Sequence, residues 1–231
     1  MRTRNPLGPD WICGPDSSTH GGVRDPWPES TPVIWTSCAW RPHRAELHTL
    51  DQLAAHLPDD YCVYHSLHFA YLDRGRQRFG EVDFVVVNAS GDILLIEQKN
   101  GGLVESGDGL HKDYSDGRKN VVSQVQHGRD AVMQQLASLF DRDTTPTVQV
   151  LLYCPDHALQ EAATAGLPRQ AILDSTERSG LEAWIERHLG PGGRDDKAGV
   201  ARDVRAWAAR ELHLAPDLGA SIDRQQRTYA R

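Results

Sequence analysis

The sequence lacks several patterns by which common protein classes are identified. No apolar run approaches the roughly 18 residues that a membrane-spanning helix needs, and no apolar stretch follows the two early arginines as a signal peptide would require. No GxxxxGK[ST] phosphate-binding loop is present, which excludes nucleotide hydrolysis by that route. The 11 histidines form no His-x-x-x-His or His-Glu-x-x-His motif. We therefore expect no membrane segment and no histidine-built metal site.

Cysteine usage is also sparse. The four cysteines form no Cys-x-x-Cys pair, and Cys62 and Cys154 lie inside apolar, strand-like runs. A reduced thiol behaves there as a small hydrophobic side chain. The pattern predicts neither a disulfide framework nor a zinc site, and it favours the reducing cytoplasm.

Positive charge is in short supply, since the formal net charge is -7 and the pI is near 5.8. A protein that grips DNA through its phosphates usually has a basic face. The balance therefore argues against strong DNA binding by the whole surface, although a local patch can coexist with it. The length of 231 residues, with 39% hydrophobic and 25% charged content, is enough for one sizeable core.

Composition divides the chain into three parts. Residues 1–42 are rich in Pro, Gly, Ser and Trp, which predicts an irregular N-terminal arm with one short strand at Val33–Thr36. Residues 43–190 hold the patterned core. Residues 191–231 are expected to form a helical C-terminal extension that links to a further domain, because the last helix reaches the end without a stop signal.

Hydrophobic periodicity gives the order of elements. Leucines at three- and four-residue spacing predict a helix over 44–57, and β-rich runs alternate with turn signals after it. The further expected elements are strands at 61–71, 82–88, 92–98 and 147–154, a turn-rich charged segment at 101–118 with a short strand and a loop, and helices at 120–140, 175–189, 198–213 and from 219 onward. Turn chemistry at 73–80 is expected to end the first of these strands. The order α-β-β-β-α-β, with trailing helices, predicts an α/β layered domain.

The strands 82–88 and 92–98 are separated by Ala89–Gly91, which suits a three-residue hairpin loop with Gly91 in the left-handed conformation. In that register the numbers of opposed residues sum to 180, so Asp83 faces Glu97. Because side chains alternate along a strand, Lys99 lies on the same face as these two acids.

Both faces of this hairpin are otherwise apolar, which indicates a strand pair buried on both sides. The face with the acids carries Val85, Val87, Ile93 and Leu95, and the other carries Phe84, Val86, Leu94 and Ile96.

Two carboxylates and a lysine at one end of a doubly buried hairpin need an explanation, because burying charge is costly unless it is paired or bound to metal. Facing carboxylates repel each other, and a hard divalent cation bound through oxygen relieves the repulsion. Such a cation would activate water and polarise a phosphoryl oxygen, while Lys99 orients the nucleophile. The alternative is a buried ion-pair cluster in which Glu81 pairs with Lys99 and backbone donors satisfy Asp83.

An acid on one strand, followed by acid-any-lysine on the next, is similar to the PD-(D/E)XK nuclease superfamily. Within it, Phe79–Val87 (FGEVDFVVV) and Ile93–Gly102 (ILLIEQKNGG) resemble the nuclease-related domain (NERD) family. Asn120–Gln124 (NVVSQ) occupies the place of that family's Asn-Pro-any-any-Gln, with Val121 in place of the proline. The departure affects helix entry more than chemistry, and the resemblance covers roughly residues 44–155.

The resemblance implies a restriction-endonuclease-like α/β fold, with a mixed central sheet flanked by helices, and metal-dependent cleavage of nucleic acid, DNA above all. By similarity, Asp83 and Glu97 are metal ligands, the Gln98 carbonyl is a further ligand and Lys99 is the catalytic lysine. The metal would be Mg²⁺ or Mn²⁺. Such domains are often fused to helicase or other ATPase modules, which would make such a module a covalently linked partner.

Two further positions are carried over with alternatives open. Glu46 lies where such nucleases supply an extra carboxylate, but an acid at a helix N-terminus is also favoured by the helix dipole. Gln124 lies on an apolar stripe of its helix, where it is either functional or a hydrogen-bonded core amide. Three basic residues could meet a phosphate backbone or could be simply solvated; they are Lys112, Arg118 and Lys119.

Two rival functions remain. A catalytically silent docking or nucleic-acid-binding module would use the same fold without turnover. A hydrolase of small nucleotides would need a narrow enclosed pocket in place of an open groove.

Overall fold

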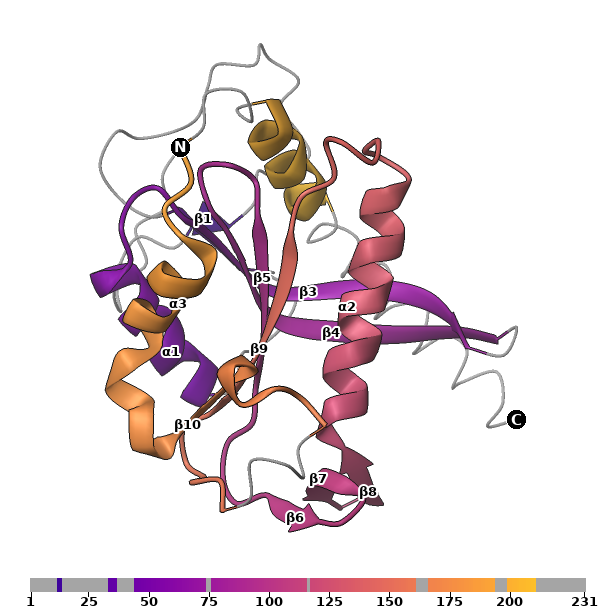
Figure 1. Ribbon diagram of the computed structural model, residues 1–231, viewed down its shortest axis with the longest axis vertical. Helices are drawn as coiled ribbons and strands as arrows, with labels where there is room; N and C mark the ends of the chain where they lie inside the picture. The colour runs from indigo at the N-terminus through magenta and orange to yellow at the C-terminus, as the bar shows by residue number, and fades with distance from the viewer. Residues whose placement is uncertain are drawn as a thin grey trace.

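A computed structural model describes residues 12–13, 33–36, 44–73, 76–115, 117–160, 166–193 and 199–210. A mixed seven-stranded sheet runs through this part of the chain, and a separate three-stranded sheet lies at one end (Figure 1). The strand order in the large sheet is β1-β2-β3-β4-β5-β9-β10. Only β4 runs antiparallel to its neighbours β3 and β5, and the other neighbours are parallel.

The strands of the large sheet are β1 (Ile12–Cys13), β2 (Val33–Thr36), β3 (Cys62–Asp73), β4 (Arg76–Val87), β5 (Ile93–Gln98), β9 (Val148–Cys154) and β10 (Ile172–Asp174). The small sheet contains β6 (Val104–Ser106), β7 (Gly109–Tyr114) and β8 (Gly117–Asn120). The helices are α1 (Arg44–His56), α2 (Val121–Ala137), α3 (Leu181–Leu189), the 3-10 turns η1 (Arg169–Ala171) and η2 (Ser175–Gly180), and an unlabelled helix over 199–210. The order α1-β3-β4-β5-α2-β9 is the expected one, and the fold is restriction-endonuclease-like.

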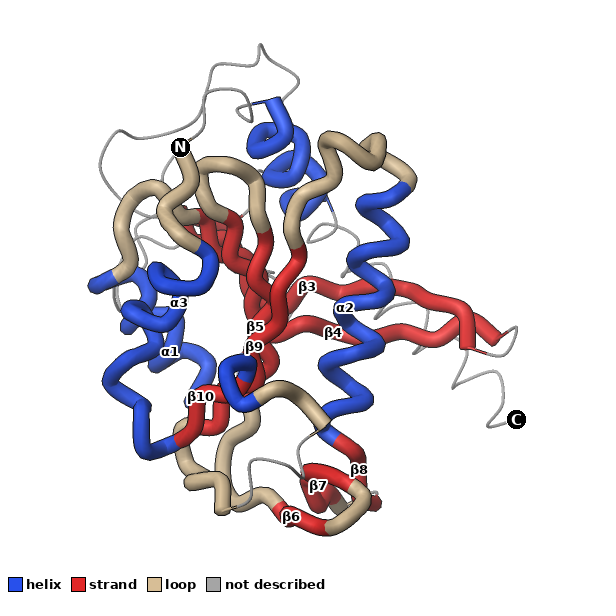
Figure 2. Tube along the Cα trace, in the orientation of Figure 1, coloured by secondary structure: helices blue, strands red, loops and turns tan. Residues whose placement is uncertain are grey.

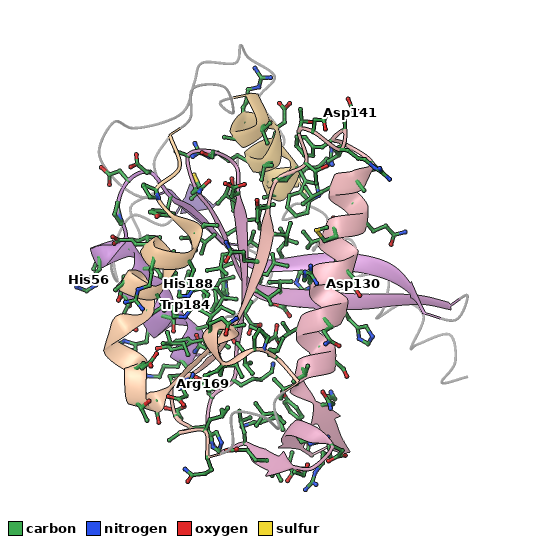
Figure 3. All side chains as sticks on the ribbon, viewed as in Figure 1. His56, Asp130, Asp141, Arg169, Trp184 and His188 are labelled. Atoms are coloured by element: carbon green, nitrogen blue, oxygen red, sulfur yellow. The ribbon has the colours of Figure 1, made fainter. Side chains whose placement is uncertain are left out.

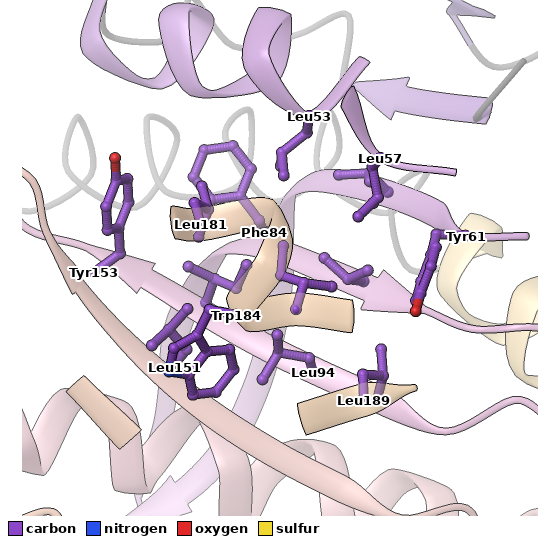
Figure 4. Close-up of a cluster of buried hydrophobic side chains, with 14 of the residues drawn as sticks. Leu53, Leu57, Tyr61, Phe84, Leu94, Leu151, Tyr153, Leu181, Trp184 and Leu189 are labelled. Atoms are coloured by element: carbon purple, nitrogen blue, oxygen red, sulfur yellow. The ribbon is translucent and has the colours of Figure 1, made fainter. Parts of the chain in front are cut away.

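The central strand β5 is buried along its whole length, and its alternate side chains enter two different cores. On one face, Phe84 and Leu94 pack between Leu53 of α1 and Trp184 of α3 (Figure 4). On the other face, the core includes side chains of α2 and of the helix over 199–210. Figure 2 shows the labelled helices on both sides of the strands. The prediction of a hairpin buried on both faces is confirmed.

The predicted register of the β4–β5 hairpin is also confirmed. Phe84 pairs with Ile96 and Val87 pairs with Ile93, so the paired numbers sum to 180. Gly91 has φ of 83°, the left-handed conformation expected for the loop. A side chain at Gly91 would also collide with the backbone of the helix over 199–210, since its Cβ would lie 2.9 Å from the Ala201 Cα.

The turn expected at 73–80 is too long, because β3 does end at Asp73 but β4 already begins at Arg76 and Gly80 lies inside it. Gly80 pairs with Phe69 of β3, and a Cβ at Gly80 would collide with the Phe69 ring. A glycine is therefore needed at position 80 because the Phe69 ring lies against it, and not because the chain turns there. The long β3–β4 hairpin passes α2 and projects beyond it in Figure 1.

The remaining predicted strands and helices are confirmed only in part. The strand at Val33–Thr36 is present, but β1 and β10 are additional, and three strands stand within 101–120 where one short strand is expected. The expected helix over 175–189 is α-helical only from Leu181, because Asp174 caps a 3-10 turn with a kink at Glu177. The helix expected from 219 lies outside the described residues. No described helix combines the length and apolar character that a membrane crossing requires.

One buried side chain, that of Asn88, joins the β4–β5 loop to the end of α3. Its Oδ1 accepts hydrogen bonds from the backbone N–H groups of Ser90 and Asp92, both at 3.0 Å. Its Nδ2 donates to the carbonyls of Leu189 at 3.0 Å and Gly190 at 3.2 Å. All four bonds go to backbone groups, so no neighbouring side chain can replace them.

We therefore expect Asn88→Ala to lower the free energy of unfolding by about 2–4 kcal/mol, because buried donors and acceptors lose their partner. Denaturant unfolding followed by circular dichroism measures it. The same substitution at Asn120, which caps α2 through one bond to the Ser123 N–H, is the control and should cost only about 1 kcal/mol. Equal costs at the two positions would contradict the role of Asn88.

Candidate metal centre

Asp83 lies at a local break in β4. The β4–β5 ladder ends at the Phe84–Ile96 pair, and none of the described strand pairs includes Asp83 or Ser66, which stands opposite it on β3. Ser66 has φ of 59°, and Val82 and Val85 point into the same core although they are three positions apart, an odd spacing that regular alternation would place on opposite faces. The alternation of side chains between the two faces of the sheet is therefore interrupted at Asp83. The pairing of β4 with β5 also ends there, next to the Asp83 carboxylate.

The end of β5 supplies the partners of this carboxylate. The backbone N–H of Gln98 donates to Asp83 Oδ2 at 2.7 Å. Lys99 Nζ donates to Glu97 Oε1 at 2.5 Å, and the Lys99 N–H binds the Tyr153 carbonyl of β9 at 2.8 Å. Both Glu97 and Lys99 are buried. The structure therefore brings together the three residues at the centre of the predicted site.

The electrostatics of this trio are unbalanced toward negative charge. Burial raises the pKa of Asp83 well above its usual value, and the charge of Glu97 raises it further, while Lys99 and the Gln98 N–H act in the opposite direction. Burial also raises the pKa of Glu97 despite the Lys99 ammonium beside it. Burial opposes the charge of Lys99, but Glu97 and Asp83 outweigh it and raise the pKa of the amine. Two carboxylates thus share one cation.

Gln98 contributes to the centre through its backbone rather than its side chain. Its side-chain Oε1 accepts a hydrogen bond from Thr49 of α1 at 2.7 Å, and its Nε2 donates to Asn100 at 3.0 Å. The N–H and C=O of one strand residue point to the same edge of the strand. Because the Gln98 N–H points at Asp83, its carbonyl oxygen faces the same gap, as the resemblance requires of a ligand.

Glu46, in the first turn of α1, approaches the centre from the other side of the sheet. Its carboxylate oxygen Oε2 lies 3.1 Å from His65 Nε2 on β3. The charge of Glu46 raises the pKa of both Asp83 and Glu97, which places it within electrostatic reach of both acids.

His65 is a neighbour of the centre that sequence reasoning alone does not find. It is buried, with its ring 5.3 Å from the ring of Phe84, and it lies next to the break at Ser66. The β3–β4 register, in which paired numbers sum to 149, places it opposite Phe84. The sequence conceals that register, because Gly80 has the signature of a turn residue.

Gln124 lies on the face of α2 that meets the sheet, one turn before Gly128, where a Cβ would lie 3.2 Å from the Val82 side chain. The side-chain oxygen of Gln124 is buried and has no hydrogen-bond partner within the described part of the chain. It is thus not the satisfied core amide of the alternative interpretation. A buried acceptor without a partner is costly, which fits an atom reserved for water or for another ligand.

Other expected neighbours make separate contacts, although the charge of Glu81 contributes, after burial, to the raised pKa of Glu97. Glu81 lies 4.0 Å from His68 Nε2, and Lys99, its expected partner in the ion-pair alternative, is taken by Glu97 instead. Of the basic residues after β6, Lys112 donates to the carbonyls of Asn100 and Gly102. Arg118 pairs with Asp113, and Lys119 lies over the Tyr114 ring.

Among the described residues, no three His, Cys, Asp or Glu side chains converge with the geometry of a metal cage. The reason is visible in the contacts, because Lys99 holds Glu97 and His65 holds Glu46. Two of the acids are thus paired with side chains of the protein itself.

Residues 41–154 match the family model of the nuclease-related domain. This segment is a NERD domain. It extends from just before α1 to the end of β9 and contains all six candidate residues. Neither a curated protein nor a solved structure matches the chain.

The raised pKa of Asp83 predicts how the stability of the metal-free protein varies with pH. A carboxyl whose pKa is raised on folding binds its proton more tightly in the folded state, so stability falls as pH rises from about 3.9 through the folded pKa. We expect Asp83→Asn to remove this loss and to raise the Tm of the metal-free protein at neutral pH by about 2–4 °C per kcal/mol recovered. Thermal unfolding with a chelator measures it.

Asp174→Asn is the matched control with the opposite sign. Burial raises the pKa of Asp174, but hydrogen bonds from Thr176 and the Leu159 N–H, together with Arg169, lower it overall. Such a group adds stability above about pH 3.9, so its replacement should lower the Tm at neutral pH. A loss of Tm in Asp83→Asn as large as that in Asp174→Asn would contradict the unbalanced charge of the centre.

Proposed function

We propose that the NERD domain is a metal-dependent nuclease that hydrolyses phosphodiester bonds of nucleic acid, with DNA as the favoured substrate. The observation that carries the proposal is the pair of buried carboxylates, Asp83 and Glu97, that share the single ammonium of Lys99. A purely structural cluster would be expected to neutralise its buried charges. Here two buried carboxyl groups stand beside one ammonium, and the raised pKa of Asp83 shows that its ionisation is opposed in the absence of a further cation.

Mg²⁺ or Mn²⁺ fits this donor set. Asp83, Glu97 and the Gln98 carbonyl would hold it, with Glu46 as the additional carboxylate, and hard cations of this kind prefer such oxygen ligands. When bound, the cation supplies Lewis acidity toward a phosphoryl oxygen and lowers the pKa of water. The raised pKa values of the acids support the fit, since a bound cation would offset both the loss of solvation on burial and the repulsion between neighbouring carboxylates.

Lys99 acts as a charged donor in this proposal. Its raised pKa keeps the amine protonated at neutral pH, so it cannot serve as the general base. The ammonium instead holds the attacking water in line and stabilises the negative charge that develops on the phosphate. The buried side-chain oxygen of Gln124 lacks a partner in the described structure, and it would accept a hydrogen bond from a water and so orient that water.

The wider context belongs to the same proposal. Residues 1–42 would be an arm, and residues 191–231 would be an extension toward a linked helicase or ATPase domain. That domain would supply the contacts to DNA phosphates that a net charge of -7 disfavours. The helix over 199–210 adds Val204 and Trp207 to the core, so the extension would begin as part of the folded unit. A DNA-processing or defence role in the cytoplasm would follow.

One observation favours the rival docking module. The internal pairs Lys99–Glu97 and His65–Glu46 satisfy two acids without metal. A silent module would keep these pairs permanently, whereas a nuclease must open them when the cation binds. Metal binding therefore separates the two functions.

The test is incubation of supercoiled plasmid and single-stranded circles with the purified protein and Mn²⁺. We expect cleavage that requires the metal and falls at least about 10²-fold in Asp83→Asn and in Lys99→Met, because each removes charge that the transition state needs. Asp143→Asn and Arg142→Gln, both exposed after α2, should retain full activity. Inert wild-type protein that also shows no metal binding by calorimetry would leave the docking module.

Glu46 has a graded role to test. Glu46→Gln keeps an oxygen for His65 but removes the charge, so we expect metal affinity to fall by about tenfold while some cleavage remains, as is typical of outer ligands. Calorimetric titration with Mn²⁺ measures it. Asp51→Asn, exposed on the same helix, should bind metal as the wild type does, and equal affinity in both variants would remove Glu46 from the ligand set.

A further inference from the structure

The small sheet lies at the end of β5 and is joined to it by Lys112. Asn100 and Gly102 follow directly after Lys99, and the Lys112 ammonium donates to the carbonyls of both. On the same sheet, Leu110 is fully buried in a core with residues of α2 and β9. The face of β7 that carries Leu110 and Lys112 is therefore the face toward the body of the domain.

Tyr114 is the next residue on that face, because side chains alternate along a strand. It ends β7 two residues beyond Lys112, whose ammonium contacts the carbonyl of Asn100, the residue after Lys99. Unlike Leu110, Tyr114 is 38% exposed. Part of an aromatic ring is therefore left exposed on the sheet that adjoins the lysine proposed as catalytic.

The neighbouring strand leaves the ring accessible and adds a positive charge. Gly117 pairs with Tyr114 and has no side chain to cover it. Lys119, which pairs with Lys112 and so shares the face, has its Nζ 4.9 Å from the centre of the ring. On the opposite face, Arg118 and Asp113 pair at 2.7 Å and tie the end of the hairpin together. The ring and the ammonium are thus presented on a fixed hairpin.

We propose that Tyr114 and Lys119 form a stacking platform beside the scissile phosphate, and that it selects single-stranded DNA. This rests on the proposed nuclease function. The exposed ring surface accepts one unpaired base, and Lys119 binds the neighbouring phosphate. In a duplex both faces of a base are covered by its neighbours, so only an unpaired or flipped base can use an aromatic platform. The platform is insensitive to sequence, since every base has a π-face.

Fluorescence anisotropy with labelled single-stranded and duplex oligonucleotides tests the platform, with Ca²⁺ as the cation. Stacking on one side chain is worth about fivefold in affinity at the lower end of its range and more at the upper end. Wild-type protein should prefer the single strand, and Tyr114→Leu should lose about tenfold of this affinity while its duplex binding stays unchanged. Tyr114→Phe, which keeps the ring, should bind as wild type does.

An abasic nucleotide provides a readout that a structural role would not move. It should weaken binding to the wild type and add no further loss in Tyr114→Leu, because base and ring act as one pair. Lys119→Gln should reduce the salt dependence by about 0.7 in the log–log slope, the value for one phosphate contact on a single strand.

Leu139→Ala and Arg142→Gln are the controls. Both residues are exposed in the segment after α2, and Figure 3 labels Asp141 there, at the end of α2 far from the small sheet. They should bind both probes as the wild type does.

The platform is overturned if Tyr114→Leu binds the single strand as tightly as wild type, if the duplex is preferred, or if neither probe binds. Cleavage measured in parallel separates this inference from the proposed function. Stacking without any cleavage would uphold the platform and remove the nuclease, whereas cleavage that is indifferent to Tyr114 would do the reverse.

Discussion

The organisation of this protein depends on the burial of β5 on both faces. A strand enclosed by α1 and α3 on one side and by α2 on the other can carry charge only where its ladder ends. The charges of β5 stand at that end, at Glu97 and beyond it at Lys99. Because water is excluded there, each charge changes the proton affinity of the others, as the raised pKa of Asp83 shows. The same packing that stabilises the fold therefore raises the proton affinity of the acids at its edge.

The central hairpin could be predicted from the sequence because local rules decide it. Gly91 specifies the loop, the loop specifies the register, and the apolar alternation specifies two buried faces. These rules bring Asp83, Glu97 and Lys99 to the same end of the hairpin, but the expected Asp83–Glu97 pair is absent, because the ladder ends at Phe84–Ile96 and Asp83 accepts a hydrogen bond from the Gln98 N–H instead. The family match over residues 41–154 adds an independent reason to regard the meeting as functional.

The parts that could not be predicted depend on contacts between distant segments. Gly80 has the appearance of a turn residue until the Phe69 ring is known to lie against it. The roles of His65 and Thr49 require the β3–β4 register and the position of α1 on the sheet. The small sheet escapes prediction because its strands are short and polar and no alternation marks them. Tertiary packing, rather than propensity, decides each of these features.

The joint between the small sheet and the body has a consequence for motion. Amides of β5 are enclosed by two cores and are expected to exchange with solvent only when the whole domain opens. The strand β8 is mostly exposed, although its sheet is attached to the body by Leu110, by the hydrogen bonds of Lys112 and by those of Glu105 to His157 and Gln160. Exposed backbone hydrogen bonds of this kind are expected to open on a faster timescale than buried ones. Hydrogen exchange should therefore be slow in β5, which carries Glu97, and faster in β8.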